Sequence, residues 1–221
     1  MAVLITEDVH LDIPMWVTDL ATFRRWTDEP NFPETGNIWW LRGVVWADMS
    51  QEQIFSHIDV KGEVYFAIKS ILRNRDLGRI FTDGLLLTNE DVGISGNPDA
   101  TFFTHEALAD GRVALIEGRT DGFTEVQGSP EMVLEVVSDS SEEKDILILR
   151  EDYFAAGILE YWLVDAREKP VQFDILRRNS KGFVTTKKVG GWLKSSVFGH
   201  SFRLTEGKDR SGNPKYTLET K

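Results

Sequence analysis

Met132-Val133-Leu134-Glu135-Val136-Val137 is a short apolar run interrupted by one carboxylate. A strand covered on both faces of a sheet normally reads as continuous Val, Ile and Leu. An ionised carboxylate leaves water at a high cost unless a partner or a metal compensates for it. A second acidic residue, Asp99, follows Pro98 at another strand-like site, and Lys144 follows the first run. These residue types predict a divalent-metal site suited to phosphodiester hydrolysis.

The composition predicts one globular domain. The chain has 221 residues, of which 41% are hydrophobic and 28% are charged, and this is enough to bury a sizeable core. There is no cysteine, so disulfides and thiolate metal sites are excluded. The net charge of −11 argues against non-specific binding to duplex DNA, which depends on Lys and Arg, but it leaves room for a local basic surface.

The sequence shows no targeting or membrane segment. Residues 1–8 lack a basic region and a long apolar core, so we expect no signal peptide. No apolar stretch reaches the roughly 18–20 residues that span a bilayer. We therefore expect a cytoplasmic protein without membrane contact.

Apolar periodicity and turn residues predict a mixture of helices and strands. Helices are expected over 51–75 and 140–156, and another is expected within 12–29, with its start at Thr18-Asp19. Residues 105–109 read as a short helix or loop. Strands are expected over 37–41, 43–47, 79–82, 84–87, 99–103, 132–137, 161–165, 171–176 and 182–186. The strands at 79–82 and 84–87 should turn at Asp83-Gly84, and the Gly-rich residues 110–128 should form a connection.

This succession favours an α/β (α+β) fold in which helices flank a mixed sheet. We expect a single domain over residues 1–221. It would carry an N-terminal helix and hairpin extension over about 1–50 and a C-terminal β tail over about 171–221.

Three segments together resemble a known family: Asn97-Pro98-Asp99, the run from 130 to 138, and the aromatic segment from 153 to 165. Their order and spacing are similar to those of the Uma-type restriction endonuclease family, within the PD-(D/E)xK nuclease superfamily. The resemblance is strong across 94–176 and weaker in the N-terminal half. It implies a restriction-endonuclease-like fold and a DNA endonuclease.

By this resemblance, Asp99 and Glu135 are the acidic metal ligands, and the backbone carbonyl of Val136 is the third protein ligand. The simplest superfamily pattern has a lysine two residues after the second acid, where this chain has a valine. This family usually supplies its lysine from the next helix, where this chain has Leu149. Lys144 is the only lysine in that helical segment, and we expect it to supply the ammonium instead.

The expected cofactor is Mg²⁺, with Mn²⁺ as a substitute. Mg²⁺ prefers oxygen ligands and retains several waters, so two carboxylates and a carbonyl suffice to hold it. A nearby ammonium would stabilise the negative charge that develops on a phosphate under attack. DNA is the expected substrate, and RNA is a weaker alternative. The absent lysine at both usual positions leaves a catalytically inactive binding or scaffold protein as the rival interpretation.

Other residues are weaker candidates. Glu63 and Glu131 are additional acidic candidates, each equally compatible with a structural role, and His57 reads as a surface or core-edge histidine. No Gly-x-Ser-x-Gly elbow, Walker loop or zinc-like histidine spacing is present. The aromatic run at 190–204 predicts an edge strand and tail that cover the core. Its alternative role is a homodimer contact through three aromatic residues: Trp192, Phe198 and Phe202. We expect a homodimer, since nucleases of this superfamily often pair to cut two strands.

Overall fold

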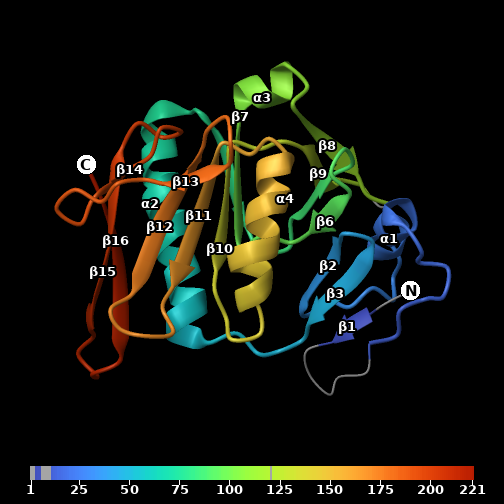
Figure 1. Cartoon of the computed structure of the whole chain (residues 1–221), viewed down its shortest axis with the longest axis horizontal. Helices are drawn as coiled ribbons and strands as arrows, with labels where there is room; N and C mark the ends of the chain where they lie inside the picture. The colour runs from blue at the N-terminus through green and yellow to red at the C-terminus, as the bar shows by residue number, and fades with distance from the viewer. Residues whose placement is uncertain (1–2, 6–10, 120) are drawn as a thin grey trace.

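A six-stranded mixed sheet forms the centre of the computed structural model, which describes residues 3–5, 11–119 and 121–221 (Figure 1). In spatial order its strands are β13 (Phe183–Thr185), β12 (Gln172–Arg178), β11 (Glu160–Asp165), β10 (Met132–Val136), β7 (Ala100–Thr104) and β4 (Gly78–Thr82). Strands β10 and β11 are parallel, and the other neighbouring pairs are antiparallel. The expected mixed sheet is confirmed.

Helices cover both faces of this sheet, and every residue of β10 is therefore buried. The even-numbered residues of β10 share a core with helix α2 (Val60–Arg75). Val133 points to the opposite face and shares a core with Tyr153 of helix α4 (Leu149–Ala155). Because side chains alternate along a strand, Glu135 faces the same side as Val133.

Both flanking helices begin with a π-helical segment. Segment η1 (Ile54–Asp59) leads into α2, and η2 (Lys144–Ile148) leads into α4. Segment η1 together with α2 confirms the expected helix over 51–75, and η2 together with α4 confirms the one over 140–156. Such π-helical turns are rare and frequently lie at functional sites. No helix in the described residues is long and apolar enough to cross a bilayer.

A seven-stranded sheet lies beside the first. Its order is β1 (Val3–Ile5), β3 (Val44–Asp48), β2 (Asn37–Leu41), β6 (Ile94–Gly96), β5 (Leu86–Asn89), β9 (Phe123–Gly128) and β8 (Val113–Glu117). The expected hairpin β2–β3 is confirmed. Helix α1 (Leu20–Thr27) lies within the expected segment, and its N-cap is Asp19, at the expected start, whose carboxylate accepts a hydrogen bond from the Thr22 amide. The expectation of no signal peptide concerns residues 1–8, and of these only 3–5 are described.

Two expectations for the middle of the chain are wrong. Residues 79–82 and 84–87 do not form a hairpin, since β4 joins the six-stranded sheet and β5 joins the seven-stranded one. Residues 110–128 are not a plain connection, because they contain the antiparallel pair β8 and β9. Val113 and Val126 of this pair are 1% exposed and share a core with α4. The short helix α3 (His105–Ala109) is confirmed.

The C-terminal tail forms a third sheet from β14 (Leu193–Lys194), β15 (Ser201–Lys208) and β16 (Pro214–Thr220). Phe198 and Phe202 are 1% and 0% exposed, and their ring centroids lie 5.6 and 4.7 Å from that of Trp162. The structural interpretation of this segment is confirmed. The alternative prediction of a dimer contact is wrong for Phe198 and Phe202, because their rings are packed in the interior of the chain.

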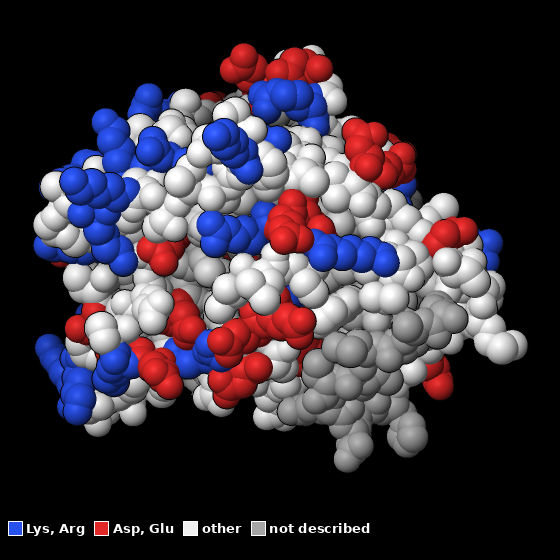
Figure 2. All heavy atoms as spheres, in the orientation of Figure 1, with Lys and Arg blue, Asp and Glu red and all other residues white. Residues whose placement is uncertain are grey.

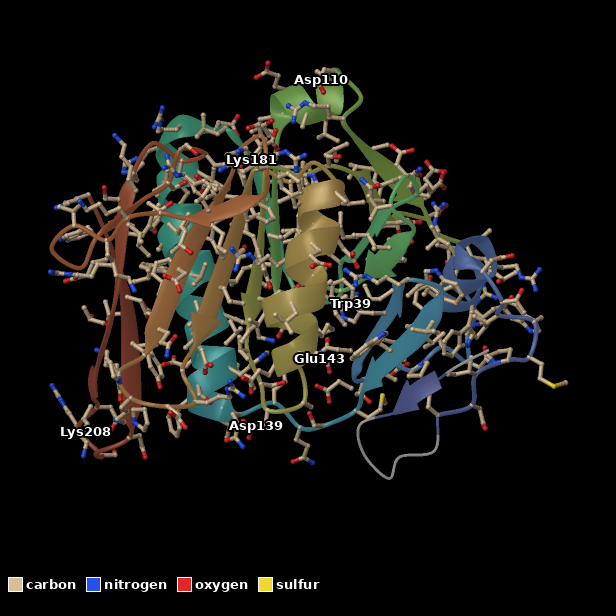
Figure 3. The ribbon with its side chains drawn as sticks, in the orientation of Figure 1. Trp39, Asp110, Asp139, Glu143, Lys181 and Lys208 are labelled. Atoms are coloured by element: carbon tan, nitrogen blue, oxygen red, sulfur yellow. The ribbon has the colours of Figure 1, made fainter. Side chains whose placement is uncertain are left out.

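Surface charge is distributed unevenly. Figure 2 shows Lys and Arg side chains gathered toward the left end of the molecule, where the C-terminal sheet lies. Exposed lysines of this part of the chain include Lys187, Lys188, Lys194 and Lys208. Asp and Glu side chains form a band lower in the same view. Exposed Asp139 and Glu143 lie on the segment that joins β10 to α4, at the lower end of that helix (Figure 3).

Candidate metal centre

Pairing of β7 with β10 brings Asp99 and Glu135 together. Ala100 lies opposite Leu134 in this antiparallel ladder, so the next residue outward on each strand is one of the two acids. Asp99 is 6% exposed and Glu135 is 3% exposed. The Oδ2 atom of Asp99 accepts a hydrogen bond of 2.6 Å from the Val136 amide. Both acids line one small pocket of about 20 Å³, which has room for about one water or ion.

Lys144 lies inside this site rather than in solvent. It is 6% exposed, and its Nζ lies 3.8 Å from Glu135 Oε2 and in contact with the Asp145 carboxylate. The ammonium also lies 4.8 Å from the centre of the Trp39 ring; Figure 3 shows Trp39 between strand β2 and helix α4. Burial alone would lower the pKa of Lys144, but Asp145 and Glu135 raise it well above its ordinary value.

Burial makes both carboxylates difficult to ionise. It raises the pKa of Asp99, and the charges of His57 and Lys61 offset only part of this effect. It raises the pKa of Glu135 well above its ordinary value, against the opposing charge of Lys144. A divalent cation would favour the ionised form of both acids. The oxygen donors and the small pocket therefore fit a hard dication.

Two tyrosines support the site from the α4 face of the sheet. The Tyr153 hydroxyl donates a hydrogen bond of 2.6 Å to Glu135 Oε1. The Tyr161 hydroxyl donates one of 2.8 Å to the Asp145 carbonyl. Both tyrosines are fully buried. Their hydroxyls also fix the positions of groups that line the pocket.

The weaker acidic candidates lie elsewhere. Glu63 accepts a hydrogen bond of 3.1 Å from the Leu218 amide of the C-terminal sheet. Glu131 accepts hydrogen bonds from the Thr104 amide and hydroxyl and forms an ion pair of 2.7 Å with Arg112. Neither lines the pocket that contains Asp99. Both have structural partners, which favours the structural interpretation of each.

The sequence misses a second group of charged residues on the other side of Asp99. Lys61 is 4% exposed, and its Nζ lies 2.7 Å from Glu52 Oε2, 2.7 Å from Asp83 Oδ1 and 3.6 Å from Asp99 Oδ1. His57, one helical turn earlier, has its Nε2 3.6 Å from Asp99 Oδ2. The sequence does contain one indication that Lys61 is buried, because it stands between Val60 and Val64 on the apolar face of α2.

Comparison with known proteins agrees with the fold. No curated protein matches this chain. One similar solved structure is described as a putative nuclease belonging to DUF820 from Anabaena variabilis ATCC 29413. It aligns with a TM-score of 0.58 and 18% identity, over 83% of this chain and 91% of that one. This similarity supports a shared restriction-endonuclease-like fold.

The family assignment rests on most of the chain. Residues 20–205 match the family Uma2, described as "Putative restriction endonuclease". They include every residue of the pocket, the whole six-stranded sheet and parts of the other two sheets. The matched region contains the three segments whose order and spacing are distinctive in the sequence. The chain therefore belongs to the Uma2 restriction endonuclease family.

Proposed function

We propose that this protein is a metal-dependent endonuclease that hydrolyses DNA phosphodiester bonds, with Mg²⁺ as the cation and Mn²⁺ as a substitute. Membership of the Uma2 family supports a nuclease in general. The observation that carries the proposal is the burial of Asp99 and Glu135 side by side, with the Lys144 ammonium 3.8 Å from Glu135. Buried charges are normally paired or bound to metals. The proposal includes one domain over all 221 residues and a cytoplasmic location.

In this proposal Asp99, Glu135 and the Val136 carbonyl hold the cation. Bound there, a divalent cation polarises a phosphate and lowers the pKa of water. The Tyr153 hydroxyl fixes Glu135 by its hydrogen bond. The ammonium of Lys144 places a positive charge beside the phosphate as negative charge develops on it. Its contacts with Trp39 and Asp145 hold that charge in position.

A polar groove gives a substrate a route to the site. It has a volume of about 440 Å³ and is lined mainly by serines, glutamines and His57. Arg167 also lines it, held by ion pairs with Asp165, Asp139 and Glu142. Hydroxyl and amide side chains commonly bind the phosphate backbone. The nearby acidic band in Figure 2 would repel a duplex at low salt, so we propose that divalent cations also help DNA to approach.

The test is cleavage of supercoiled plasmid by the purified protein. The wild type is expected to nick the plasmid with Mg²⁺ or Mn²⁺ and to lose this activity in EDTA. Lys144→Met is expected to lower the rate by about 10²–10³-fold, since it removes the proposed charge beside the phosphate. Lys181→Met is the control, because Lys181 is exposed. If the wild type cleaves the plasmid with none of the divalent cations tested, the proposed endonuclease activity is wrong.

The rival proposal is a catalytically inactive nuclease-fold protein. It is favoured by Leu149, which stands at the usual family position for lysine and is 0% exposed in the apolar core. Val137 is likewise buried, at 2% exposed. Under this proposal the same preparation would bind DNA without nicking it, and Lys144→Met would change neither result.

We also propose a homodimer formed through one face of η1 and α2. Ile54, Ile58 and Phe66 are 67%, 49% and 66% exposed, and Gly62 stands between the last two at the same four-residue spacing. A Cβ atom added to Gly62 would meet nothing within 4 Å, so packing inside the chain does not require glycine there. Antiparallel pairing of two copies would bring acidic Asp59 toward the basic C-terminal half of α2 in the partner.

Ile58→Glu is the test of this interface. It places a charge in the apolar stripe, and sedimentation velocity is expected to show a change from dimer to monomer. Leu147→Glu is the matched control, since Leu147 is 60% exposed on η2, outside this face. A monomeric wild type, or a dimer that Ile58→Glu leaves intact, would contradict the interface.

A further inference from the structure

Glu52, His57 and Asp99 form a second group of ligand atoms next to the Asp99–Glu135 pair. Each offers one ligand atom, and all three atoms lie within 4.8 Å of one another. His57 is 7% exposed, and its Nδ1 has no hydrogen-bond partner among the described residues. A buried ring nitrogen without a hydrogen bond is unfavourable, so this histidine needs an explanation.

The separations around His57 fit metal ligands better than hydrogen bonds. Its Nδ1 lies 3.4 Å from Glu52 Oε2, and its Nε2 lies 3.6 Å from Asp99 Oδ2. A hydrogen bond from nitrogen to oxygen normally spans about 2.7–3.2 Å. Two ligands that each lie about 2.1 Å from a tetrahedral metal are about 3.4 Å apart. Each distance therefore suits a pair of atoms that share a cation, and one cation uses only one of the two ring nitrogens, because their lone pairs point in different directions.

We propose that Glu52, Asp99 and one ring nitrogen of His57 bind a first-row transition-metal dication in preference to Mg²⁺. Imidazole suits such metals, whereas Mg²⁺ takes oxygen ligands. Glu135 takes no part in this site, which shares only Asp99 with the proposed magnesium site. Binding at this group does not depend on the proposed hydrolysis of DNA.

Lys61 is the competing cation at this site. Its ammonium lies 2.7 Å from Glu52 Oε2 and 3.6 Å from Asp99 Oδ1, so it lies beside two of the three ligand residues. Asp83, whose side chain is 59% exposed, accepts a hydrogen bond of 2.7 Å from the same ammonium. When a metal binds, Lys61 can keep Asp83 as its partner. Lys61→Met is therefore expected to tighten metal binding.

The experiment is a titration of tag-free, metal-free protein with Co²⁺, followed by its visible absorption and repeated in competition with Mg²⁺. The wild type is expected to bind Co²⁺ at least about tenfold more tightly than Mg²⁺. His57→Ala and Glu52→Gln are each expected to weaken Co²⁺ binding by at least about 10–100-fold, which is the loss typical of removing even a hydrogen-bond partner of a metal ligand. His105→Ala is the control, since the side chain of His105 is 44% exposed and paired with Asp76.

Glu135→Gln separates this proposal from the nuclease. It is expected to keep the Co²⁺ absorption while it loses DNA cleavage, so failure of one proposal leaves the other standing. The Glu52 side chain is 32% exposed, and Glu52→Gln therefore tests the site with little risk to folding. Unchanged Co²⁺ affinity in both His57→Ala and Glu52→Gln would overturn the site. Loss of Co²⁺ binding in Glu135→Gln but not in Glu52→Gln would do the same.

Discussion

Glu135→Gln is expected to lower Mg²⁺-dependent DNA cleavage by at least about 10³-fold. Loss of one electrostatic group that acts in a transition state costs about 10²–10³-fold, and this substitution also removes one of only two proposed carboxylate ligands. The shape of the side chain is retained, as is an oxygen that can accept the Tyr153 hydrogen bond. Single-turnover cleavage of a labelled duplex at saturating Mg²⁺ would measure the effect.

The same variant is expected to be more stable than the wild type without metal at alkaline pH. The pKa of Glu135 is raised in the folded protein, so the folded state holds a proton that the unfolded chain releases above about pH 4.5. Wild-type stability therefore falls as the pH rises from that value toward the folded pKa. Glutamine does not titrate and avoids this loss. A gain of about 1 kcal/mol would raise the Tm by about 2–4 °C.

Thermal unfolding in EDTA at pH 5 and pH 8 tests this part of the prediction. The gap between the variant and the wild type should widen at pH 8 and close when Mg²⁺ is added to both. Glu143→Gln is the matched control, since Glu143 is exposed one residue before Lys144. Equal pH dependence in the variant and the wild type would contradict the raised pKa. Cleavage at the wild-type rate would remove Glu135 from the mechanism.

The sequence predicts the central acids because each breaks a local rule. Glu135 interrupts a run that otherwise reads as a covered strand, and Asp99 follows a proline at the start of another. Their proximity depends on the pairing of β7 with β10, which joins segments far apart in the chain. The family resemblance supplies this pairing, whereas periodicity alone gives the strands without their order.

The second group of charges is harder to predict for the same physical reason. Glu52 precedes its helix, and His57 and Lys61 are one turn apart on it, so helical spacing links only the last two. Their link to Asp99 exists only after α2 packs on the sheet. The strand pair β8 and β9 is not predicted from the sequence for a different reason. The glycines of this region favour turns, so the whole region reads as a connection although it also contains apolar strand residues.

Glu160 illustrates a buried acid whose role is structural. It is 0% exposed, and its Oε2 accepts hydrogen bonds from the Trp162 indole at 3.0 Å and the Ser195 hydroxyl at 2.6 Å. Its Oε1 accepts hydrogen bonds from the Ser196 amide and hydroxyl and from the Val197 amide. This carboxylate joins β11 to the loop between β14 and β15 of the C-terminal sheet. No metal is needed to explain its burial, since donors surround it.

Glu160→Ala is therefore expected to lower the free energy of unfolding by roughly 3–5 kcal/mol. Several buried donors would lose their acceptor, and each unpaired donor costs about 1–3 kcal/mol. Urea unfolding would measure the loss. Glu168→Ala is the control, since Glu168 is exposed and its substitution should change stability by less than about 0.5 kcal/mol. Strand β16 contacts η1, which carries His57. A loosened C-terminal sheet should therefore also weaken Co²⁺ binding. A loss of stability below about 1 kcal/mol would show that water replaces these hydrogen bonds and that the C-terminal sheet is held by its aromatic contacts instead.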